Sequence, residues 1–409
     1  RCNPAALRVR CPWWTIHAHG QSARKGRQKT ITEMPTENAT RPGLNPEPVT
    51  PAPATPSADE VAERVFDSLL GAFEIQAIYL GDRLGWYDDI VANGPVTARG
   101  LAQRTESDER YAREWLEQQA STGYLVCDNP ADPAGRRRFH LEPGTAEALT
   151  DSDSLVFMGP FARFSAGLGK HMDTLVDAYR NGRGVSWAEL GEDPREAQAA
   201  ANRPLFLGPL GREFLPSIPA VDSALASGGR IADVGCGFGW STVGIAESYP
   251  QALADGFDID GPSIDAARRI AQDRGIADRV GFHELDAAEA PGEGTYDVVT
   301  AFECIHDMGD PTGVLAAMKR LVKEDGTVIV MDERVGDTFE GPADEVEQLF
   351  YGFSLMCCLP DGRSHEHSAA TGTVMRHGTL EEYAVRAGFE GVEVLEIEHD
   401  FFRFYRLVH

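Results

Sequence analysis

The sequence has no long apolar run and relatively few cationic residues. No stretch of its 409 residues approaches the roughly 18 consecutive apolar residues of a membrane-spanning helix, so no membrane segment is predicted. Its 38 Lys and Arg stand against 64 Asp and Glu, which gives a net charge of −26. A body this acidic repels the phosphate backbone of nucleic acids. A nucleic acid is therefore not expected as a partner.

Cysteine pairs at metal-binding or redox spacing are also missing. The seven cysteines form no CxxC pair, and their odd number favours reduced thiols, which predicts a cytoplasmic protein. Cys357 and Cys358 are expected to pack as apolar side chains, because adjacent cysteines seldom reach disulfide geometry without strain. His365, Glu366 and His367 lack a further spaced ligand, so no metal is predicted there.

Residues 1–57 lack the apolar content of a folded domain. Seven prolines fall between residues 35 and 57, and such a segment buries too little apolar area to offset the entropy of the chain. We therefore predict a disordered, Pro-rich and basic tail. Residues 1–33 are expected to be added sequence upstream of a natural start at Met34, with an organellar transit peptide as the alternative.

What the sequence does have is a glycine-rich turn after an apolar strand. Within residues 231–242 the strand ends in Asp233, and Gly235, Gly237 and Gly239 follow with one residue between them. Glycines let the backbone turn sharply and approach a ligand more closely than a Cβ would allow. Hydroxyl and N–H groups at the following helix start favour a polar or anionic group. A nucleotide-like cofactor is therefore expected at this turn.

The residue after Gly239 separates two kinds of cofactor. Dinucleotide-binding loops prefer a small residue there, because it lets the helix pack close to the strand. Trp240 is too bulky for that role, which disfavours a nicotinamide oxidoreductase. The spacing instead resembles motif I of the class I S-adenosylmethionine (SAM) methyltransferases, and SAM is the cofactor that this resemblance implies.

Downstream of the turn, strand and helix patterns alternate at short intervals. Strand patterns, two of them with the loop that follows, fall at residues 252–260, 279–289, 296–308 and 326–333. Helical patterns fall between them at residues 263–274 and 311–323. This alternation predicts an α/β fold with a doubly wound, mostly parallel sheet. The methyltransferase resemblance implies the Rossmann-like sheet of seven strands of the class I enzymes.

Acidic residues at strand ends complete the expected cofactor site. Asp258 closes the second strand about 20 residues after the loop, where a carboxylate can accept hydrogen bonds from both ribose hydroxyls, and Asp260 is the nearby alternative. The resemblance further implies that Asp286 contacts the adenine. The complete set of predicted cofactor contacts is Asp233, Gly235, Cys236, Gly237, Gly239, Asp258, Ile259, Asp286, Ala287 and Phe302.

The segment 58–150 resembles a winged-helix domain that is mainly helical. Its first part predicts a helix, because apolar residues recur at intervals of three and four and form an apolar face that must pack on something. These residues are Val61, Val65, Phe66, Leu69, Leu70, Phe73 and Ala77. Residues 96–127 then predict two short helices, the second of which ends at Gly123. Tyr124–Cys127 and Arg138–Leu141 predict the two strands of a wing.

The second of these helices decides between two roles for the domain. Its inward side chains are predicted to be Tyr111, Trp115 and Leu116. Its charged residues are mainly acidic, whereas a face that binds phosphates should be positive. We therefore predict dimerisation rather than DNA binding, and a homodimer as the assembled form.

Two further segments are candidates for the acceptor pocket. Residues 151–220 predict a helical linker rich in aromatic residues, which usually belong to a core, although pockets also form at such domain interfaces. Residues 342–360 predict an apolar helix, followed by a Gly/Ser-rich loop at 361–373, where class I enzymes commonly build a lid. The predicted domains are residues 1–57, 58–150, 151–220 and 221–409.

The catalytic chemistry is expected after the fourth strand. Residues 305–308 (IHDM) resemble the position of the catalytic histidine in plant-type small-molecule O-methyltransferases, which also pair a winged helix with a SAM domain. His306 as a neutral imidazole, with an ordinary pKa of about 6.5, would suit the removal of a hydroxyl proton. The resemblance also implies Asp332, beside Glu333, as the acid that supports the histidine. A second acid of the family has no clear match, because His377 stands near its place.

From about residue 60 to the end, the chain resembles actinobacterial winged-helix methyltransferases more closely than the plant enzymes. The resemblance implies a SAM-dependent methyltransferase that acts on a small, largely apolar acceptor at a hydroxyl group. Two alternatives stay open from the sequence. His306 could close the cofactor pocket without acting as a base, and the protein could be a SAM-responsive transcriptional regulator with little or no catalysis.

Overall fold

The computed structural model describes residues 55–409, so the predicted disordered tail falls almost entirely outside the described residues. The described chain forms two compact units that divide after Glu74. The first part of α1 (Ala58–Arg83) belongs to the smaller unit, and the larger unit begins at Ile75. None of the helices in residues 55–409 is long and apolar enough to cross a membrane.

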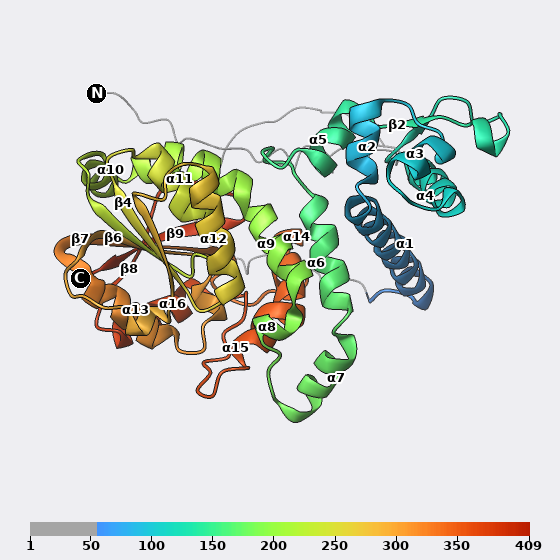
Figure 1. The fold of residues 1–409 in the computed structure, drawn as a ribbon. Coiled ribbons are helices and arrows are strands. Elements are labelled where there is room, and N and C mark those ends of the chain that lie inside the picture. The colour runs from blue at the N-terminus through green and yellow to red at the C-terminus, as the bar shows by residue number, and fades with distance from the viewer. Residues whose placement is uncertain (1–54) are drawn as a thin grey trace, which may run out of the picture. The chain divides into compact units, whose positions relative to one another are not determined.

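Short helices and a two-stranded antiparallel ribbon follow α1, as the sequence predicts for a winged helix (Figure 1). Thr97 and Asp108 cap the starts of α3 and α4 through side-chain oxygens, and Gly123 ends α4 with a φ of 88°. The elements are α2 (Trp86–Asn93), α3 (Ala98–Arg104), α4 (Glu109–Thr122), β1 (Val126–Cys127), η3 (Ala134–Arg136), β2 (Phe139–His140) and α5 (Pro143–Thr150).

One expectation for this segment is wrong. Tyr111 is 75% exposed, whereas Trp115 and Leu116 are buried as predicted. In the first turn of α4 the buried position is taken by Ala112, which belongs to the core that α2 and α3 form, and the neighbouring Tyr111 side chain stays outside it. The apolar face of α1 is exposed within the described residues, with Val65 64% and Phe66 59% exposed, and its packing on another surface stays a prediction.

The predicted helical linker is helical almost throughout. Pro204 and Pro209 lack the N–H that a regular α-helix needs, and a π-helical segment, η4, spans Phe206–Phe214. Phe206 and Phe214 are buried in the core beside the sheet, so these aromatic residues belong to the core. The elements are α6 (Gly159–Gly169), α7 (Met172–Asn181), α8 (Trp187–Leu190), α9 (Glu192–Leu205), η4 and η5 (Leu215–Ser217).

The C-terminal part is built on a seven-stranded, mainly parallel sheet, which confirms the predicted α/β fold. The strand order is β5-β4-β3-β6-β7-β9-β8, in which β9 runs antiparallel to both neighbours. The central strands are almost entirely buried, as expected for a parallel sheet covered on both faces. The strands are β3 (Arg230–Val234), β4 (Leu253–Asp258), β5 (Val280–Glu284), β6 (Tyr296–Phe302), β7 (Val322–Glu333), β8 (Gly391–Val394) and β9 (Phe402–Val408).

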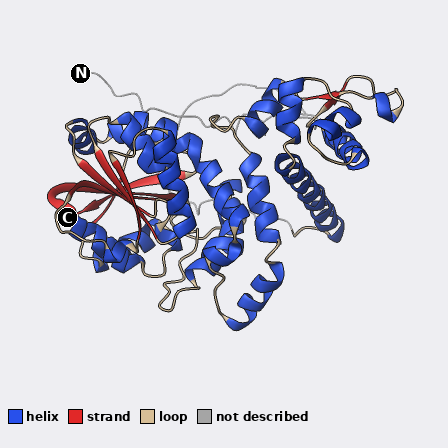
Figure 2. Ribbon diagram, in the orientation of Figure 1, coloured by secondary structure: helices blue, strands red, loops and turns tan. Residues whose placement is uncertain are grey.

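Helices cover both faces of this sheet (Figures 1 and 2). One core holds side chains of α10 (Pro219–Ala226), α11 (Trp240–Ser248) and α12 (Gly261–Asp273). The other holds side chains of α13 (Pro311–Leu321) and α16 (His377–Arg386). The carboxyl ends of the parallel strands share one edge, where ligands bind in open α/β sheets. The loops at this edge carry the predicted site residues.

The insert after β7 is helical, as predicted, and packs against the linker. It contains α14 (Glu345–Phe353), the π-helical η8 (Ser354–Cys358) and α15 (Leu359–Gly362). Phe350 and Cys357 are buried, whereas Leu349 is 43% exposed and falls outside the buried face. Cys357 belongs to one core cluster with Phe164 and Leu168 of α6. The insert and the linker therefore form one layer.

Candidate active site

The glycine-rich turn leaves β3 and starts α11. Gly235, Gly237 and Gly239 have positive φ angles of 70°, 52° and 75°, which disfavour any side chain. A Cβ at Gly235 would lie 2.7 Å from the Cys304 sulfur, and one at Gly239 would lie 2.5 Å from the Phe282 ring. A Cβ at Gly237 would meet nothing within 4 Å. The outer glycines therefore allow protein packing, whereas Gly237 faces open space where a ligand can approach.

Asp233 supports this turn through hydrogen bonds from side-chain hydroxyls. Its carboxylate accepts hydrogen bonds from Ser241 Oγ at 2.5 Å, Thr242 Oγ1 at 2.7 Å and Thr300 Oγ1 at 3.1 Å. The hydroxyls at the helix start are thus used inside the protein, contrary to the expectation that they face a ligand. Burial raises the pKa of Asp233 above its ordinary value. The geometry fits a residue that orients the loop.

Asp258 and Asp260, the two candidates for a sugar contact, have different partners. Asp260 caps α12 and forms a two-point ion pair with Arg195 of α9, at 2.7 and 3.0 Å. Asp258 instead accepts backbone N–H groups, from Gly237 at 2.8 Å and Asp260 at 2.9 Å. The Ile259 N–H also bonds to this carboxylate, and because a carboxylate has about four lone-pair sites, Asp258 keeps capacity for a hydroxyl donor. The arrangement favours Asp258 over Asp260.

The residues predicted around the adenine lie at the ends of β4 and β5. Asp286 is exposed, and its side chain accepts the Ala288 N–H at 2.9 Å, which starts the short turn η6 (Ala287–Glu289). Ala287 is buried beside it. Ile259 is 61% exposed directly after Asp258. An exposed apolar side chain beside an open glycine turn fits the wall of a nucleoside site.

Cys236 and Phe302 lie deeper than a cofactor wall requires. Both are buried in the main core cluster, and the Phe302 ring packs 5.9 Å from the Phe206 ring. Burial raises the pKa of the Cys236 thiol, which keeps it protonated and unreactive. Both side chains support the edge of the sheet, and direct contact with a cofactor stays a prediction.

His306 lies in the short turn η7 (Ile305–Asp307) after β6 and is only 2% exposed. Its Nδ1 is 2.7 Å from Asp332 Oδ1 and 2.9 Å from Glu333 Oε2, both at the end of β7. Its Nε2 is 3.3 Å from Asp307 Oδ1. The structure therefore brings the predicted pair His306 and Asp332 into direct contact. Asp307 and Glu333 also lie beside the imidazole, although the motif comparison had not assigned them to it.

The acids change how His306 titrates. Burial alone would lower the pKa of His306, but Asp307, Asp332 and Glu333 outweigh burial and raise this pKa well above its ordinary value. Burial would raise the pKa of Asp332, yet the imidazolium lowers it overall. Burial raises the pKa of Glu333 well above its ordinary range. The expectation of an unperturbed imidazole is therefore wrong, because the sequence could not reveal three acids around the ring.

Two groups of side chains around His306 have the residue types and closeness of metal ligands. One joins His306 to Asp332 and Glu333, and the other joins it to Asp307 and Cys358. In each group, carboxylates already lie within hydrogen-bond or ion-pair distance of an imidazole nitrogen. These direct contacts account for the cluster without a metal ion.

The comparisons with known proteins agree with this geometry. The Methyltransferase domain model matches residues 225–361, and the Rv2258c-like winged HTH domain model matches residues 75–151. The mitomycin biosynthesis 6-O-methyltransferase of Streptomyces lavendulae is 26% identical over 361 residues, which cover 84% of this chain and 97% of that protein. The chain carries a SAM-dependent methyltransferase domain.

Solved structures share the fold of this methyltransferase. The mitomycin 7-O-methyltransferase structure matches with a TM-score of 0.64 at 23% identity, over 85% of this chain and 98% of its own. Human N-acetylserotonin methyltransferase, solved in complex with SAM, matches with a TM-score of 0.62 at 18% identity, over 87% and 99%. The likeness confirms the predicted fold, including the N-terminal winged helix. The predicted domain limits stay predictions.

Sequence reasoning missed the helix that lies over the methyltransferase site. Arg195, Gln198 and Asn202 recur at helical spacing along α9, and all three reach the strand edge through Asp260 or Glu303. A polar stripe on a helix usually indicates solvent, so the pattern alone gave no usable signal. The predicted lid loop does reach the site, because Gly372 N–H donates to His306 O at 3.2 Å.

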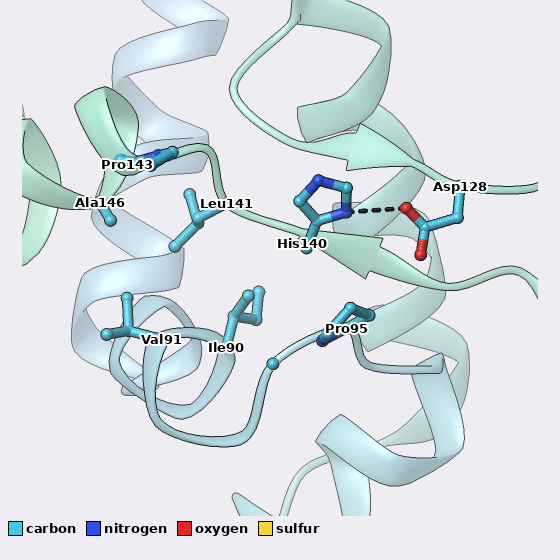
Figure 3. A pocket seen from close by; sticks show the side chains of 9 residues that line it. Ile90, Val91, Pro95, Asp128, His140, Leu141, Pro143 and Ala146 are labelled. Carbon is cyan, nitrogen blue, oxygen red and sulfur yellow. Dashed lines mark ion pairs between the residues drawn. The ribbon is translucent and has the colours of Figure 1, made fainter.

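A separate pocket of about 370 Å³ lies in the winged-helix part of the methyltransferase (Figure 3). Ile90 and Leu141 contribute apolar surface, and an ion pair between His140 and Asp128 at 2.8 Å lies at its edge. It contains none of the predicted cofactor or catalytic residues. It is therefore distinct from the site at the strand edge.

Proposed function

We propose that this methyltransferase transfers the methyl group of SAM to a hydroxyl group of a small, largely apolar molecule. The proposal rests on His306, which lies in the turn after strand β6. Its imidazole is buried, and its Nδ1 is hydrogen-bonded to Asp332. A mitomycin 6-O-methyltransferase is similar over nearly its whole length, which supports O-methylation of a small molecule.

Residues of the strand edge would hold the cofactor. The open space at Gly237 and the acceptor capacity of Asp258 fit the sugar of a nucleoside, and Ile259 offers an apolar surface next to it. Asp286 and Ala287 would lie toward the base. When bound, SAM supplies an electrophilic methyl group on a positively charged sulfur.

His306 would remove the proton of the acceptor hydroxyl. As the oxygen forms its bond to the methyl carbon, the hydroxyl proton moves to Nε2 of His306. Asp332, hydrogen-bonded to Nδ1, holds the ring orientation and stabilises the imidazolium that results. Because the surrounding acids raise the pKa of His306, a higher pH is needed to form the neutral imidazole that accepts this proton.

The linker and the insert would form the acceptor pocket. The Phe164 and Phe353 rings pack edge to face with their centroids 5.1 Å apart. The centroid of the Phe161 ring lies 6.3 Å from that of Phe353. Cys358 lies close to His306 and Asp307 in the same layer. An apolar lining of this kind excludes water and favours an aromatic or otherwise apolar acceptor.

We further propose a cytoplasmic homodimer that does not bind DNA. The exposed apolar side chains of α1, among them Val65, Phe66 and Phe73, form a stripe that a second copy would cover. Helix α4 carries Glu109, Glu114 and Glu117, and such an acidic surface disfavours a phosphate backbone.

The experiment is transfer of an isotopically labelled methyl group. The purified protein is incubated with SAM carrying a labelled methyl group and with a metabolite extract, and products are identified by mass spectrometry. A product that gains one methyl group with the wild type and not with His306→Ala supports the proposal. Binding of SAM without any methylated product would favour the regulator alternative.

A further inference from the structure

Glu303 has a backbone conformation that its residue type disfavours. Its φ is 54°, in the left-handed region, and its N–H donates to Met331 O at 2.8 Å, which holds it at the end of β6. A non-glycine residue in this region costs about 1–3 kcal/mol unless the surroundings impose it, and such positions cluster at functional sites. Glycine would avoid this strain, so the side chain itself is a candidate for a function.

The carboxyl group of Glu303 is buried and only partly satisfied. Its Oε2 accepts a long hydrogen bond from Gln198 Nε2 at 3.4 Å, and Asn202 also bonds to the carboxyl group. Its Oε1 is buried with no hydrogen-bond partner among the described residues. A buried polar atom without a partner costs about 1–3 kcal/mol, so a ligand that bonds to it gains that free energy.

Helix α9 fixes where this carboxyl group lies. Arg195 pairs with Asp260 at the end of β4, and Asn202 reaches Glu303 at the end of β6. Seven residues of helix span about 10 Å. Two strand spacings, from β4 across β3 to β6, also span about 10 Å. The helix therefore crosses the strand edge, with its Arg195 end above the cofactor residues and its Asn202 end above the strand that leads to His306.

The protonation state of Glu303 suits two-way hydrogen bonding. Burial raises the pKa of Glu303 to about 8, and the nearby positive His306 opposes this shift only in part. At neutral pH the group is therefore mainly a carboxylic acid. It can donate one hydrogen bond and accept others.

We propose that Glu303 binds the acceptor through a second polar group, next to the hydroxyl that is methylated. The inference rests on the proposed function and names its substrate class: acceptors with a hydroxyl, amino or carbonyl group adjacent to the methylated hydroxyl. Glu303 belongs to the acceptor and not to the cofactor because the cofactor residues lie toward β4 and β5, whereas Glu303 precedes His306 by three residues. An acceptor with one isolated hydroxyl would leave Oε1 unpaired.

Two variants and two probes test the inference. Glu303→Gln keeps a neutral group that donates and accepts, whereas Glu303→Leu keeps a similar volume without polar atoms. The probes are 1,2-dihydroxynaphthalene, with adjacent hydroxyls, and 2-naphthol, with one. Initial rates give kcat and KM for each probe, and calorimetry gives the dissociation constant of S-adenosylhomocysteine for each protein.

We expect the wild type to have a KM at least 10-fold lower for the adjacent diol than for 2-naphthol. Glu303→Leu should raise the KM for the diol about 10- to 100-fold and abolish the preference, which corresponds to one buried hydrogen bond. Glu303→Gln should stay within about threefold of the wild type. Affinity for S-adenosylhomocysteine should not change in either variant.

Other results overturn the inference. A 10-fold loss of S-adenosylhomocysteine affinity in Glu303→Leu would assign Glu303 to the cofactor. A preference for the diol that survives in this variant, or a wild type that methylates both probes equally or neither, would remove the predicted contact. If Glu303→Leu does not fold, Gln198→Leu replaces it, because loss of this amide should release the carboxyl group and raise the same KM. A wild type that binds no S-adenosylhomocysteine would instead refute the proposed function itself.

Discussion

His306 and Asp332 meet through a hydrogen bond of 2.7 Å between Nδ1 and Oδ1, although 26 residues separate them in the chain. The contact follows from the sheet: β6 and β7 are parallel neighbours, with Phe302 opposite Met331, so the residues after both strands emerge at the same edge. Both side chains are at most 2% exposed. Because Nδ1 is held by a buried acid, Nε2, which lies 3.3 Å from Asp307 Oδ1, is the nitrogen proposed to take a proton from an acceptor.

Replacing His306 should separate catalysis from cofactor binding. His306→Gln removes the proposed base and keeps a polar side chain, so kcat should fall about 10²- to 10⁴-fold. Affinity for S-adenosylhomocysteine, measured by calorimetry, should stay unchanged. His367→Ala, an exposed histidine in the 361–373 loop, is the control and should retain full activity. Retained turnover in His306→Gln would leave alignment of the substrates as the sole mechanism.

Asp332→Asn should move the pH profile of kcat toward lower pH. The imidazole acts as a base only when deprotonated, so activity should rise as the pH passes through the raised pKa of His306. Loss of the Asp332 charge lowers this pKa, and the rising limb should shift down by about one pH unit. The remaining acids limit the shift, because the groups that still face or influence the ring are Glu303, Asp307, Glu333 and Cys358.

The maximal rate of Asp332→Asn should also fall, by roughly tenfold or more, because the imidazolium loses its stabilising carboxylate. The measurement is kcat between pH 6 and 10 for wild type and variant, in buffers matched for ionic strength. A rising limb that stays in place, or moves to higher pH, would show that Asp332 does not set the titration of His306.

Gly237 should be needed for the cofactor and not for the fold. Gly237→Ala puts a methyl group into open space at a φ of 52°, so the free energy of unfolding should fall by only about 1 kcal/mol. Gly275→Ala is a matched control, with a φ of 69° and nothing within 4 Å of the added Cβ, but outside the predicted site. S-adenosylhomocysteine affinity should fall about tenfold or more in Gly237→Ala alone. Equal losses in both variants would argue against a ligand at this turn.

The apolar stripe of α1 should hold two copies together. Phe66 and Phe73 are 59% and 56% exposed, and their replacement in the double variant Phe66→Glu, Phe73→Glu puts charge into the proposed contact. Sedimentation should give a dimer for the wild type and a monomer for the variant, with unchanged secondary structure by circular dichroism. The control is Glu63→Lys, on the same helix. A monomeric wild type would refute the proposed dimer.

The fold, and the gathering of the candidate cofactor residues at one edge of the sheet, could be predicted because the sequence patterns that indicate them are local. Alternating strand and helix patterns place Asp233, Asp258 and His306 at or after the carboxyl ends of β3, β4 and β6, and parallel strands bring such residues to one edge. The choice between Asp258 and Asp260 could not be made from the neighbouring sequence. It depends on Arg195, which pairs with Asp260 from 65 residues away.

The electrostatics of the catalytic residues could not be predicted from sequence. Asp332 and Glu333 are adjacent, and strand alternation would send them to opposite faces, yet both contact Nδ1 of His306 because the strand ends there. Glu303 gave no signal either, since neither its positive φ nor its contact with Gln198 has a sequence pattern. These features depend on tertiary packing.

The most direct test of the central claim is the affinity of S-adenosylhomocysteine for Asp258→Ala. If Asp258 binds the ribose hydroxyls, calorimetry should show tight binding to the wild type and a loss of about 10- to 100-fold in the variant. Asp265→Ala, which removes an exposed acid of α12, should bind as the wild type does. Wild-type protein that is folded and gives no heat with S-adenosylhomocysteine, or Asp258→Ala that binds it unchanged, would contradict the proposed cofactor site.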